Sequence, residues 1–230
     1  MTHHDDAIDE WIWLIRNNEI PHCKEQELLI DNIVIPTLNR RDILIDSDVI
    51  RRGLSLQKYF PYKLLPWEKF QFALLAGVFV KTESGRRDNW FKKCLDIIGR
   101  GAGKNGFIDF LAFYFISPYN TDGVSGMIKG YNVDLIANGE DQAATSIIDV
   151  ADIINDPVSP AFKRTLEKQF KATKERVTNL QTGSVFRLNT TSTKNKDSKR
   201  TGAIVFDELH QYTDTTNMNT LRSAYFLCLS

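Results

Sequence analysis

The stretch CLDIIGRGAGKNGF, residues 94–107, decides the fold that we predict. Its first five residues are mainly apolar and predict a buried strand. Four glycines follow at positions 99, 101, 103 and 106, and they let the backbone turn tightly and bring its N–H groups close to an anion. Lys104 adds a positive charge, and the apolar run 107–116 predicts a helix whose N-terminus points to the same place. This order of features predicts a cradle for nucleotide phosphates.

The match to the phosphate-loop pattern G-x-x-x-x-G-K-[ST] is partial. Gly103 and Lys104 fit the pattern, whereas Ile98 stands where the first glycine is expected. Asn105 stands where a hydroxyl normally ligates Mg²⁺, and its amide oxygen is a weaker ligand. The alternative interpretation is an ordinary glycine-rich turn between a strand and a helix.

A second stretch, AIVFDEL at residues 203–209, predicts a buried strand that ends in an acidic pair. Open α/β sheets bind ligands at the carboxyl edge of their strands. There Asp207 would hold Mg²⁺, and Glu208 would orient or deprotonate an attacking water. A helix N-cap is the alternative interpretation of the pair. Both stretches in this order predict an α/β fold of the P-loop NTPase type, with a mostly parallel sheet flanked by helices.

The rest of the chain supplies further helices and strands for such a fold. Apolar residues at helical spacing, punctuated by prolines, predict helices, and shorter apolar runs between turn residues predict strands. The predicted helices cover 5–60 in three segments (the third at 42–59), 66–78, 142–154, 161–171 and 218–227. The predicted strands cover 131–137, 175–179 and 184–189, and a polar loop covers 190–201.

Length and composition bound the architecture and the environment. A chain of 230 residues holds one α/β domain with a helical appendage, which we place at 61–230 and 1–60. Three scattered cysteines are typical of reduced thiols in a cytosolic protein and have no metal-ligand spacing. No apolar run has the length of a membrane span, and no signal segment opens the chain.

The net charge is zero, but the charges are unevenly distributed. Residues 158–200 hold eleven basic and three acidic residues, whereas residues 1–50 hold four basic and eleven acidic ones. A basic block of this size can follow a phosphate backbone, and its few aromatic residues favour backbone contact over base stacking. A solvated helix face with a charged loop is the alternative interpretation.

Four segments, in order, resemble the large terminase subunit of tailed bacteriophages, the ATPase that packages DNA into proheads. LLPWEKFQFALLAG (64–77) is similar to the family's adenine-side motif, and NWFKKCLDIIGRGAGKNGF (89–107) to its variant phosphate loop, which commonly carries an arginine and lacks the first glycine. ANGEDQAATSI (137–147) resembles a strand-then-helix segment, and KRTGAIVFDELHQY (199–212) resembles the acidic-pair segment. The resemblance covers roughly residues 60–225.

The resemblance implies ATP and Mg²⁺ as ligands and gives the loop residues their roles. Lys104 would bind the β- and γ-phosphates, Arg100 would sense or stabilise the γ-phosphate charge, and Glu208 would activate water. Asp207, with Asn105, would hold Mg²⁺. The implied phosphate-binding residues are Gly99, Gly101, Ala102, Gly103, Lys104, Asn105 and Gly106. A solvent-exposed turn residue is the alternative for Arg100.

The resemblance places adenine contact at the first turn of the helix that begins near Pro66. Trp67, Glu68 and Gln71 are the implied contacts, with Glu68 where the family has glutamine. A carboxylate accepts from the adenine amino group but does not donate to the ring nitrogen.

The resemblance also implies a truncated domain and a set of partners. Large terminases continue into a coupling motif and a nuclease domain, and this sequence stops at Ser230 before both. We therefore expect an ATPase domain with an incomplete sheet and no nuclease. The implied partners are double-stranded DNA, the portal protein, the small terminase subunit and other copies in a ring, in the host cytoplasm. The alternatives are a non-catalytic remnant that binds a nucleotide or a partner, and another P-loop helicase or translocase.

Overall fold

The computed structural model describes residues 4–83, 87–99, 101–122, 126–136, 140–188 and 201–207, with the backbone alone for 140–143. The chain divides into two compact units. Unit 1 comprises residues 1–57, 62–102 and 119–126, and unit 2 comprises 58–61, 103–118 and 127–230. Each unit contains residues from both sides of the predicted boundary at residue 60. The division into a helical appendage and an ATPase domain stays a prediction. Within the described part, no helix is long and apolar enough to cross a membrane.

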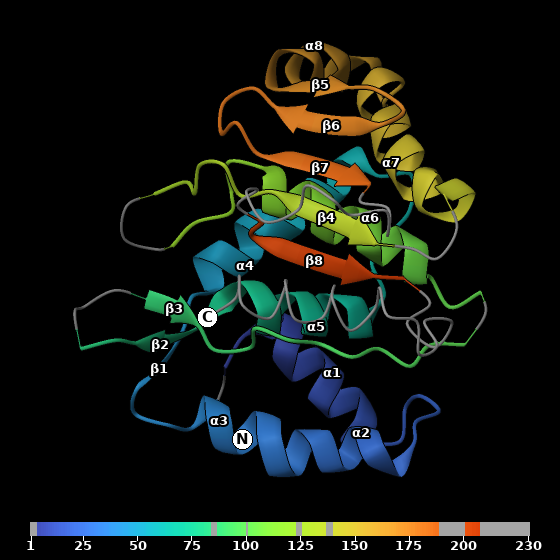
Figure 1. The fold of residues 1–230 in the computed structure, drawn as a ribbon. Coiled ribbons are helices and arrows are strands. Elements are labelled where there is room, and N and C mark those ends of the chain that lie inside the picture. The colour runs from blue at the N-terminus through green and yellow to red at the C-terminus, as the bar shows by residue number, and fades with distance from the viewer. Residues whose placement is uncertain are drawn as a thin grey trace, which may run out of the picture. The chain divides into compact units, whose positions relative to one another are not determined.

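Unit 1 combines helices with a small sheet (Figure 1). Its elements are α1 (Asp6–Arg16), α2 (Lys24–Leu29), the π-helical turn η1 (Ile30–Val34), α3 (Ile35–Leu38), β1 (Ile43–Ile45), α4 (Ser47–Leu54), most of the 3-10 helix η2 (Ser55–Tyr59), α5 (Pro66–Gly77), β2 (Val78–Lys81) and β3 (Arg87–Asn89).

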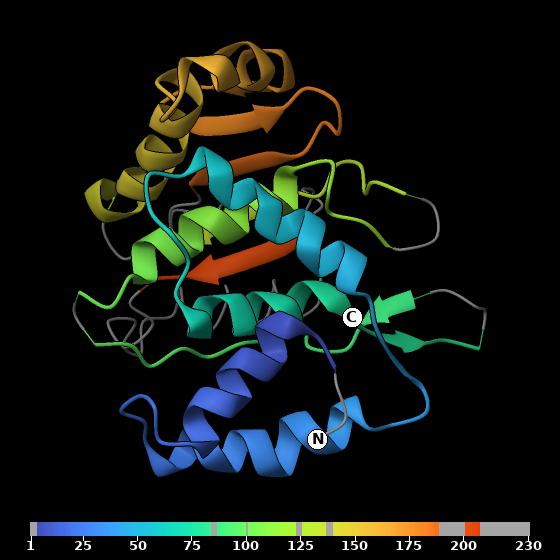
Figure 2. The same cartoon turned by 180° about the vertical axis from the view of Figure 1, so that it is seen from behind.

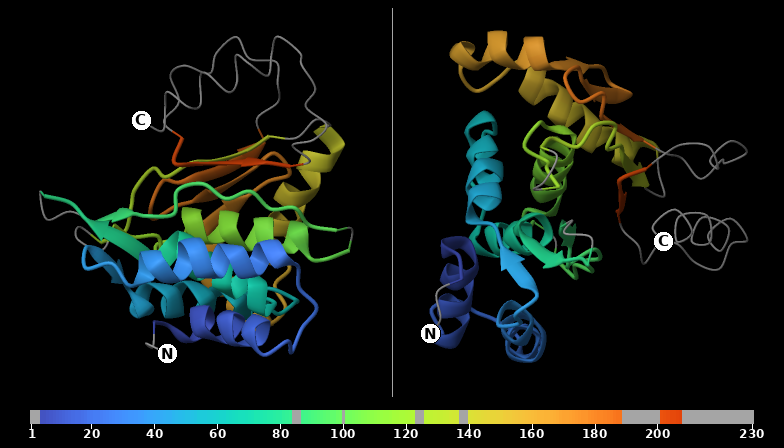
Figure 3. Two further views of the ribbon diagram at one scale, coloured as in Figure 1. Left: turned by 90° about the horizontal axis from the view of Figure 1, so that it is seen from below. Right: turned by 90° about the vertical axis from the view of Figure 1, so that its left-hand side faces the viewer.

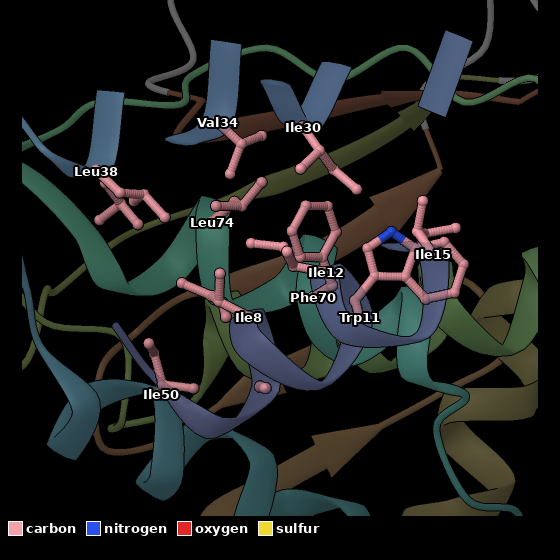
Figure 4. Close-up of a cluster of buried hydrophobic side chains, with 13 residues drawn as sticks. Ile8, Trp11, Ile12, Ile15, Ile30, Val34, Leu38, Ile50, Phe70 and Leu74 are labelled. Carbon is pink, nitrogen blue, oxygen red and sulfur yellow. The ribbon is translucent and has the colours of Figure 1, made fainter. Parts of the chain in front are cut away.

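The core of unit 1 forms where α1 and α5 pack together. Asp5 caps α1 by accepting a hydrogen bond from the N–H of Ala7 at 3.0 Å, which orders the first turn. The apolar face of α1 then meets side chains of α5 and of the segment from η1 to α3 (Figure 4). The largest members of this buried cluster are Trp11, Ile12, Ile15, Ile30 and Phe70.

The strands of unit 1 correct the predicted third helix, 42–59. β1, β2 and β3 form an antiparallel sheet in that order, and α4 begins only at Ser47. The helix starts there because the Asp46 side chain accepts a hydrogen bond from the N–H of Val49 at 3.1 Å. The three apolar residues before this cap pair with β2 instead.

The predicted strand at residues 94–98 is wrong, because residues 91–99 form no strand. Leu95 and Ile97 are 72% and 94% exposed, so the apolar run is not covered. Side chains hold the segment instead: the Gln71 amide donates to Cys94 Sγ at 2.8 Å and to Asp96 Oδ2 at 2.6 Å. An apolar run becomes a strand only where another strand pairs with it.

Unit 2 is built around a five-stranded sheet (Figure 1). Its helices and strands are α6 (Lys104–Ile116), β4 (Val133–Ile136), α7 (Glu140–Asn155), α8 (Pro160–Gln169), β5 (Phe170–Ala172), β6 (Arg176–Asn179), β7 (Val185–Leu188) and β8 (Ala203–Phe206). The strands predicted at 131–137, 175–179, 184–189 and 203–206 and the helices predicted at 107–116, 142–154 and 161–171 are confirmed, with small shifts at their ends. The predicted helix 218–227 and residues 190–200 of the predicted loop lie outside the described residues.

The sheet is mixed, with the strand order β5-β6-β7-β4-β8. β7, β4 and β8 run parallel, and β5 and β6 extend them as an antiparallel ribbon. The α/β class with a helix-flanked sheet is confirmed, whereas the pairing among the described strands is evenly divided rather than mostly parallel. The antiparallel part arises because Gly183, with a φ of 70°, lets the chain reverse between β6 and β7.

The helices α6 and α7 cover the same face of this sheet (Figures 2 and 3). α6 is apolar almost all round and buries four aromatic rings, as expected for a helix inside a core. The ring of Phe113 lies 4.9 Å from that of Phe170 on β5, which fixes the helix-facing side of the ribbon.

Candidate phosphate-binding site

The candidate site begins with the glycine turn at the N-terminus of α6. Gly101 and Gly103 have φ angles of 77° and 90°, a left-handed backbone that residues with a side chain rarely adopt. Gly103 is the residue before the first helical residue, Lys104, and its carbonyl accepts from the N–H of Phe107 at 3.1 Å. The turn is therefore followed directly by a helix of thirteen residues, as the sequence predicted.

The other half of the site follows the end of β8. Asp207 is the residue after the strand, and its N–H donates to the carbonyl of Ile136 at 2.9 Å, which continues the parallel pairing with β4. This hydrogen bond fixes the backbone of Asp207 at the carboxyl edge of the parallel strands, where open α/β sheets place ligands.

Lys104 and Asp207 meet in the folded chain. Lys104 Nζ lies 2.7 Å from Asp207 Oδ1, with side chains that are 30% and 8% exposed. The lysine from the glycine turn and the acid from the second stretch thus share one place, although they come from distant parts of the sequence. This is the convergence that the two stretches predicted, and the roles of the two residues stay predictions.

The paired groups suit a phosphate with its divalent cation. A lysine at a helix N-terminus offers positive charge to an anion, in addition to the free backbone N–H groups of the first turn. Within the described residues no three His, Cys, Asp or Glu side chains form a metal cluster. Mg²⁺ is commonly held by one or two carboxylates together with substrate phosphates, so Asp207 alone fits that arrangement.

The remaining predicted loop residues are neighbours of Lys104 in the sequence. Gly99, Gly101, Ala102, Gly103 and Asn105 are exposed, and Gly106 is half-buried. A Cβ atom added at Gly99 or Gly101 would meet no atom within 4 Å, so the backbone there is open to a ligand. Arg100 and Glu208 lie outside the described residues.

The predicted adenine contacts Trp67, Glu68 and Gln71 lie on α5 of unit 1. Trp67 is half-buried against the core cluster of that unit. The buried Glu68 carboxylate accepts from the N–H of Leu65 at 2.6 Å, and burial raises its pKa. Gln71 donates its amide to the 94–96 segment. Glu68 and Gln71 therefore have structural partners within unit 1, and adenine contact stays a prediction for all three.

Sequence reasoning missed a buried ion pair on the sheet. Asp134 on β4 accepts from Arg187 Nε of β7 at 2.6 Å and from the Thr201 hydroxyl at 2.7 Å. The signal was an aspartate inside a strand that is otherwise apolar, since a buried charge needs a partner.

It also missed a buried acid between two helices. Asp109 on α6 is 2% exposed, and burial raises its pKa to about 8. A hydrogen bond from Ser146 of α7 opposes this shift, whereas the charge of Asp149 adds to it. The signal was again a lone acid within an apolar helix.

The fold is similar to that of a bacteriophage large terminase. No family model matches the chain, and no curated protein matches it. The crystal structure of the HK97 bacteriophage large terminase matches with a TM-score of 0.55 and 15% sequence identity. The fold is terminase-like. The match covers 76% of this chain and 34% of the HK97 chain, so the terminase-like region spans about a third of that protein.

Proposed function

We propose that the chain is the ATP-hydrolysing part of a DNA-packaging motor. The observation that carries the proposal is the 2.7 Å approach of Lys104 to Asp207 at the N-terminus of α6. The terminase-like fold supports it. The resemblance of the two sequence stretches to the terminase family supports it as well. The double-stranded DNA, the portal protein and the small terminase subunit are the partners that the proposal implies.

The residues divide the chemistry among them. Lys104 and the N–H groups of the glycine turn would bind the β- and γ-phosphates, and Asp207 would hold Mg²⁺, which would supply positive charge to those phosphates. Glu208 orients the attacking water, and Arg100 stabilises charge on the γ-phosphate. Phosphoryl transfer needs positioning and charge neutralisation more than covalent help from the protein, which suits this small set of residues.

The ion pair between Lys104 and Asp207 has a consequence for nucleotide binding. Each group is the other's counter-ion while no phosphate or metal lies between them. With a triphosphate and Mg²⁺ bound, Lys104 would attract the phosphates and Asp207 would hold the metal, so each group would exchange one counter-ion for another. We therefore expect nucleotide and Mg²⁺ to bind together and each to weaken without the other.

The test is Mg²⁺-dependent phosphate release by the purified chain. The wild type should release phosphate from ATP above background, and Lys104→Ala and Glu208→Gln should reduce the rate by about 100-fold or more. Lys24→Ala, which removes an exposed lysine of α2, is the control and should keep the wild-type rate. Equal background rates in the wild type and both site variants would contradict the proposal and favour a remnant that binds without turnover.

A further inference from the structure

The antiparallel ribbon of unit 2 has two chemically different faces. Residues alternate between the faces of a strand, and the register of β5, β6 and β7 shows which residues share a face. Phe170, Val177 and Phe186 lie on the side that α6 and α7 cover, and all three are buried. The opposite face therefore carries the residues that alternate with them.

That opposite face is basic. Lys171, Arg176 and Arg187 lie on it, one from each strand of the ribbon. Lys171 and Arg176 are exposed, whereas Arg187 is largely covered and bound to Asp134. Within the described part of the chain, neither Lys171 nor Arg176 forms an ion pair with an acid. We call these three residues the ribbon patch.

The arrangement of the ribbon patch favours an anionic ligand. Arg176 stands directly opposite Arg187 in the register of β6 and β7. Like charges that face each other across two strands destabilise a sheet, and Asp134 offsets only the Arg187 charge. A chain of phosphates in contact with both strands would offset the remaining repulsion.

Neighbouring residues extend the positive charge beyond the ribbon. Helix α8 packs next to β5 (Figure 1) and carries Lys163, Arg164 and Lys168, all exposed. Lys174 is also exposed, in the turn between β5 and β6. In all, residues 158–188 hold seven basic and two acidic residues.

The ligand that fits is the phosphate backbone of a nucleic-acid duplex. The aromatic side chains of this region pack inside the protein. Phe170 and Phe186 are buried, and Phe162 packs edge-on against Tyr59 with ring centroids 5.0 Å apart. Single-strand binders stack bases on aromatic rings, and the ribbon patch offers none. Protein partners bury apolar cores, whereas interfaces with duplexes are polar and strongly positive.

We infer that the ribbon patch and the adjoining face of α8 bind the backbone of double-stranded DNA. The inference rests on the proposed function only in naming DNA as the duplex. It assigns the binding to the antiparallel part of the sheet, away from the carboxyl edge where Lys104 and Asp207 meet. The contact is electrostatic and independent of sequence, as phosphate contacts are.

The experiment measures duplex DNA binding without nucleotide at a series of salt concentrations. The variant is Lys171→Gln/Arg176→Gln, because both side chains are exposed and their loss leaves the Asp134–Arg187 pair intact. The control is Lys24→Gln/Arg52→Gln, which removes two exposed charges from unit 1. Thermal unfolding of both variants shows that each is folded at the assay temperature.

The expected result is a weaker affinity for the ribbon variant, with a salt dependence reduced by roughly two phosphate contacts (a slope change of about 1.8). The control should bind as the wild type does. Equal affinity and slope in the ribbon variant and the control would overturn the inference. So would a ribbon variant that binds DNA normally but loses self-association, since the patch would then bind the acidic N-terminal region of another copy. Because nucleotide is absent, a chain without ATPase activity still gives a readable result.

Discussion

Two aspartates of unit 2 differ in what surrounds them. Asp207 and Asp109 are both nearly inaccessible, at 6% and 2% exposure. Asp207 Oδ1 lies 2.7 Å from the Lys104 amine, whereas Asp109 has a hydrogen bond from the neutral Ser146 and the negative charge of Asp149 nearby. Burial without a cation raises the pKa of Asp109 to about 8.

The comparison separates a candidate functional acid from a structural one. The helix α6 supplies both environments, since Lys104 at its N-terminus reaches the sheet edge and Asp109 points into the contact with α7. A metal ligand must stay charged, and of these two acids Asp207 is the one with a cation beside it. Asp109 is protonated near neutral pH and contributes to packing.

The largest expected difference between the two acids is in phosphate release. Asp207→Asn removes the carboxylate that faces the metal and should lower the rate by about 100-fold or more. Asp109→Asn keeps the shape and the neutral state and should stay within about threefold of the wild type. Steady-state assays with Mg²⁺ and ATP measure both. Similar losses in the two variants would mean that the acids do not differ in function.

A third acid, Asp134, tests how much an ion pair with a cation contributes to the free energy of unfolding. Asp134→Ala leaves Arg187 largely covered without its carboxylate and should destabilise unit 2 by about 3 kcal/mol. Asp134→Asn keeps one acceptor oxygen, for either Arg187 or Thr201, and should cost less than the alanine variant. Urea unfolding gives both free energies. A loss below about 1 kcal/mol for the alanine variant would show that the pair is only marginally stabilising.

Removing the charge of Asp109 should change the free energy of unfolding in the opposite direction. Its folded pKa lies above the unfolded value, so the folded state keeps a proton that the unfolded state releases between pH 4 and about 8. The acid therefore costs nothing below the unfolded pKa, and its cost grows as pH rises toward about 8. Asp109→Asn removes this dependence, so its stabilising effect should be almost nothing at pH 4 and should grow as pH rises to about 8.

Urea unfolding of the wild type and Asp109→Asn at several pH values checks this prediction. The difference between the two curves isolates Asp109 from the other titrating groups. A difference that does not change with pH would show that Asp109 titrates normally in the folded chain.

The sequence predicted those parts of the fold that local patterns determine. The apolar run after Lys104 and the alternation in 175–189 lead directly to α6, β6 and β7. The apolar run at 94–98 has the same local character as β8 but lacks a paired strand, and no local pattern reveals that. Strand formation depends on a partner elsewhere in the chain, whereas a helix completes its own hydrogen bonds.

For the candidate site, too, the sequence predicted the residues whose type is restricted by their chemistry but not the contacts that depend on the fold. Glycines, a lysine and an acidic pair are recognisable because their chemistry restricts the residue types. The pairing of Asp134 with Arg187 depends on the register of β4 with β7 across 53 residues, so the sequence showed a buried acid without its partner. These acids show that a single charged residue within an apolar run predicts a contact with a polar or charged partner, although the sequence does not identify that partner.

The most direct measurement is a crystal structure of the chain with Mg²⁺ and a non-hydrolysable ATP analogue. The account predicts that the terminal phosphates lie at the N-terminus of α6, with Lys104 Nζ within hydrogen-bonding distance of them and the Asp207 carboxylate turned to the metal. A nucleotide bound elsewhere, with the Lys104–Asp207 pair unchanged, would contradict it.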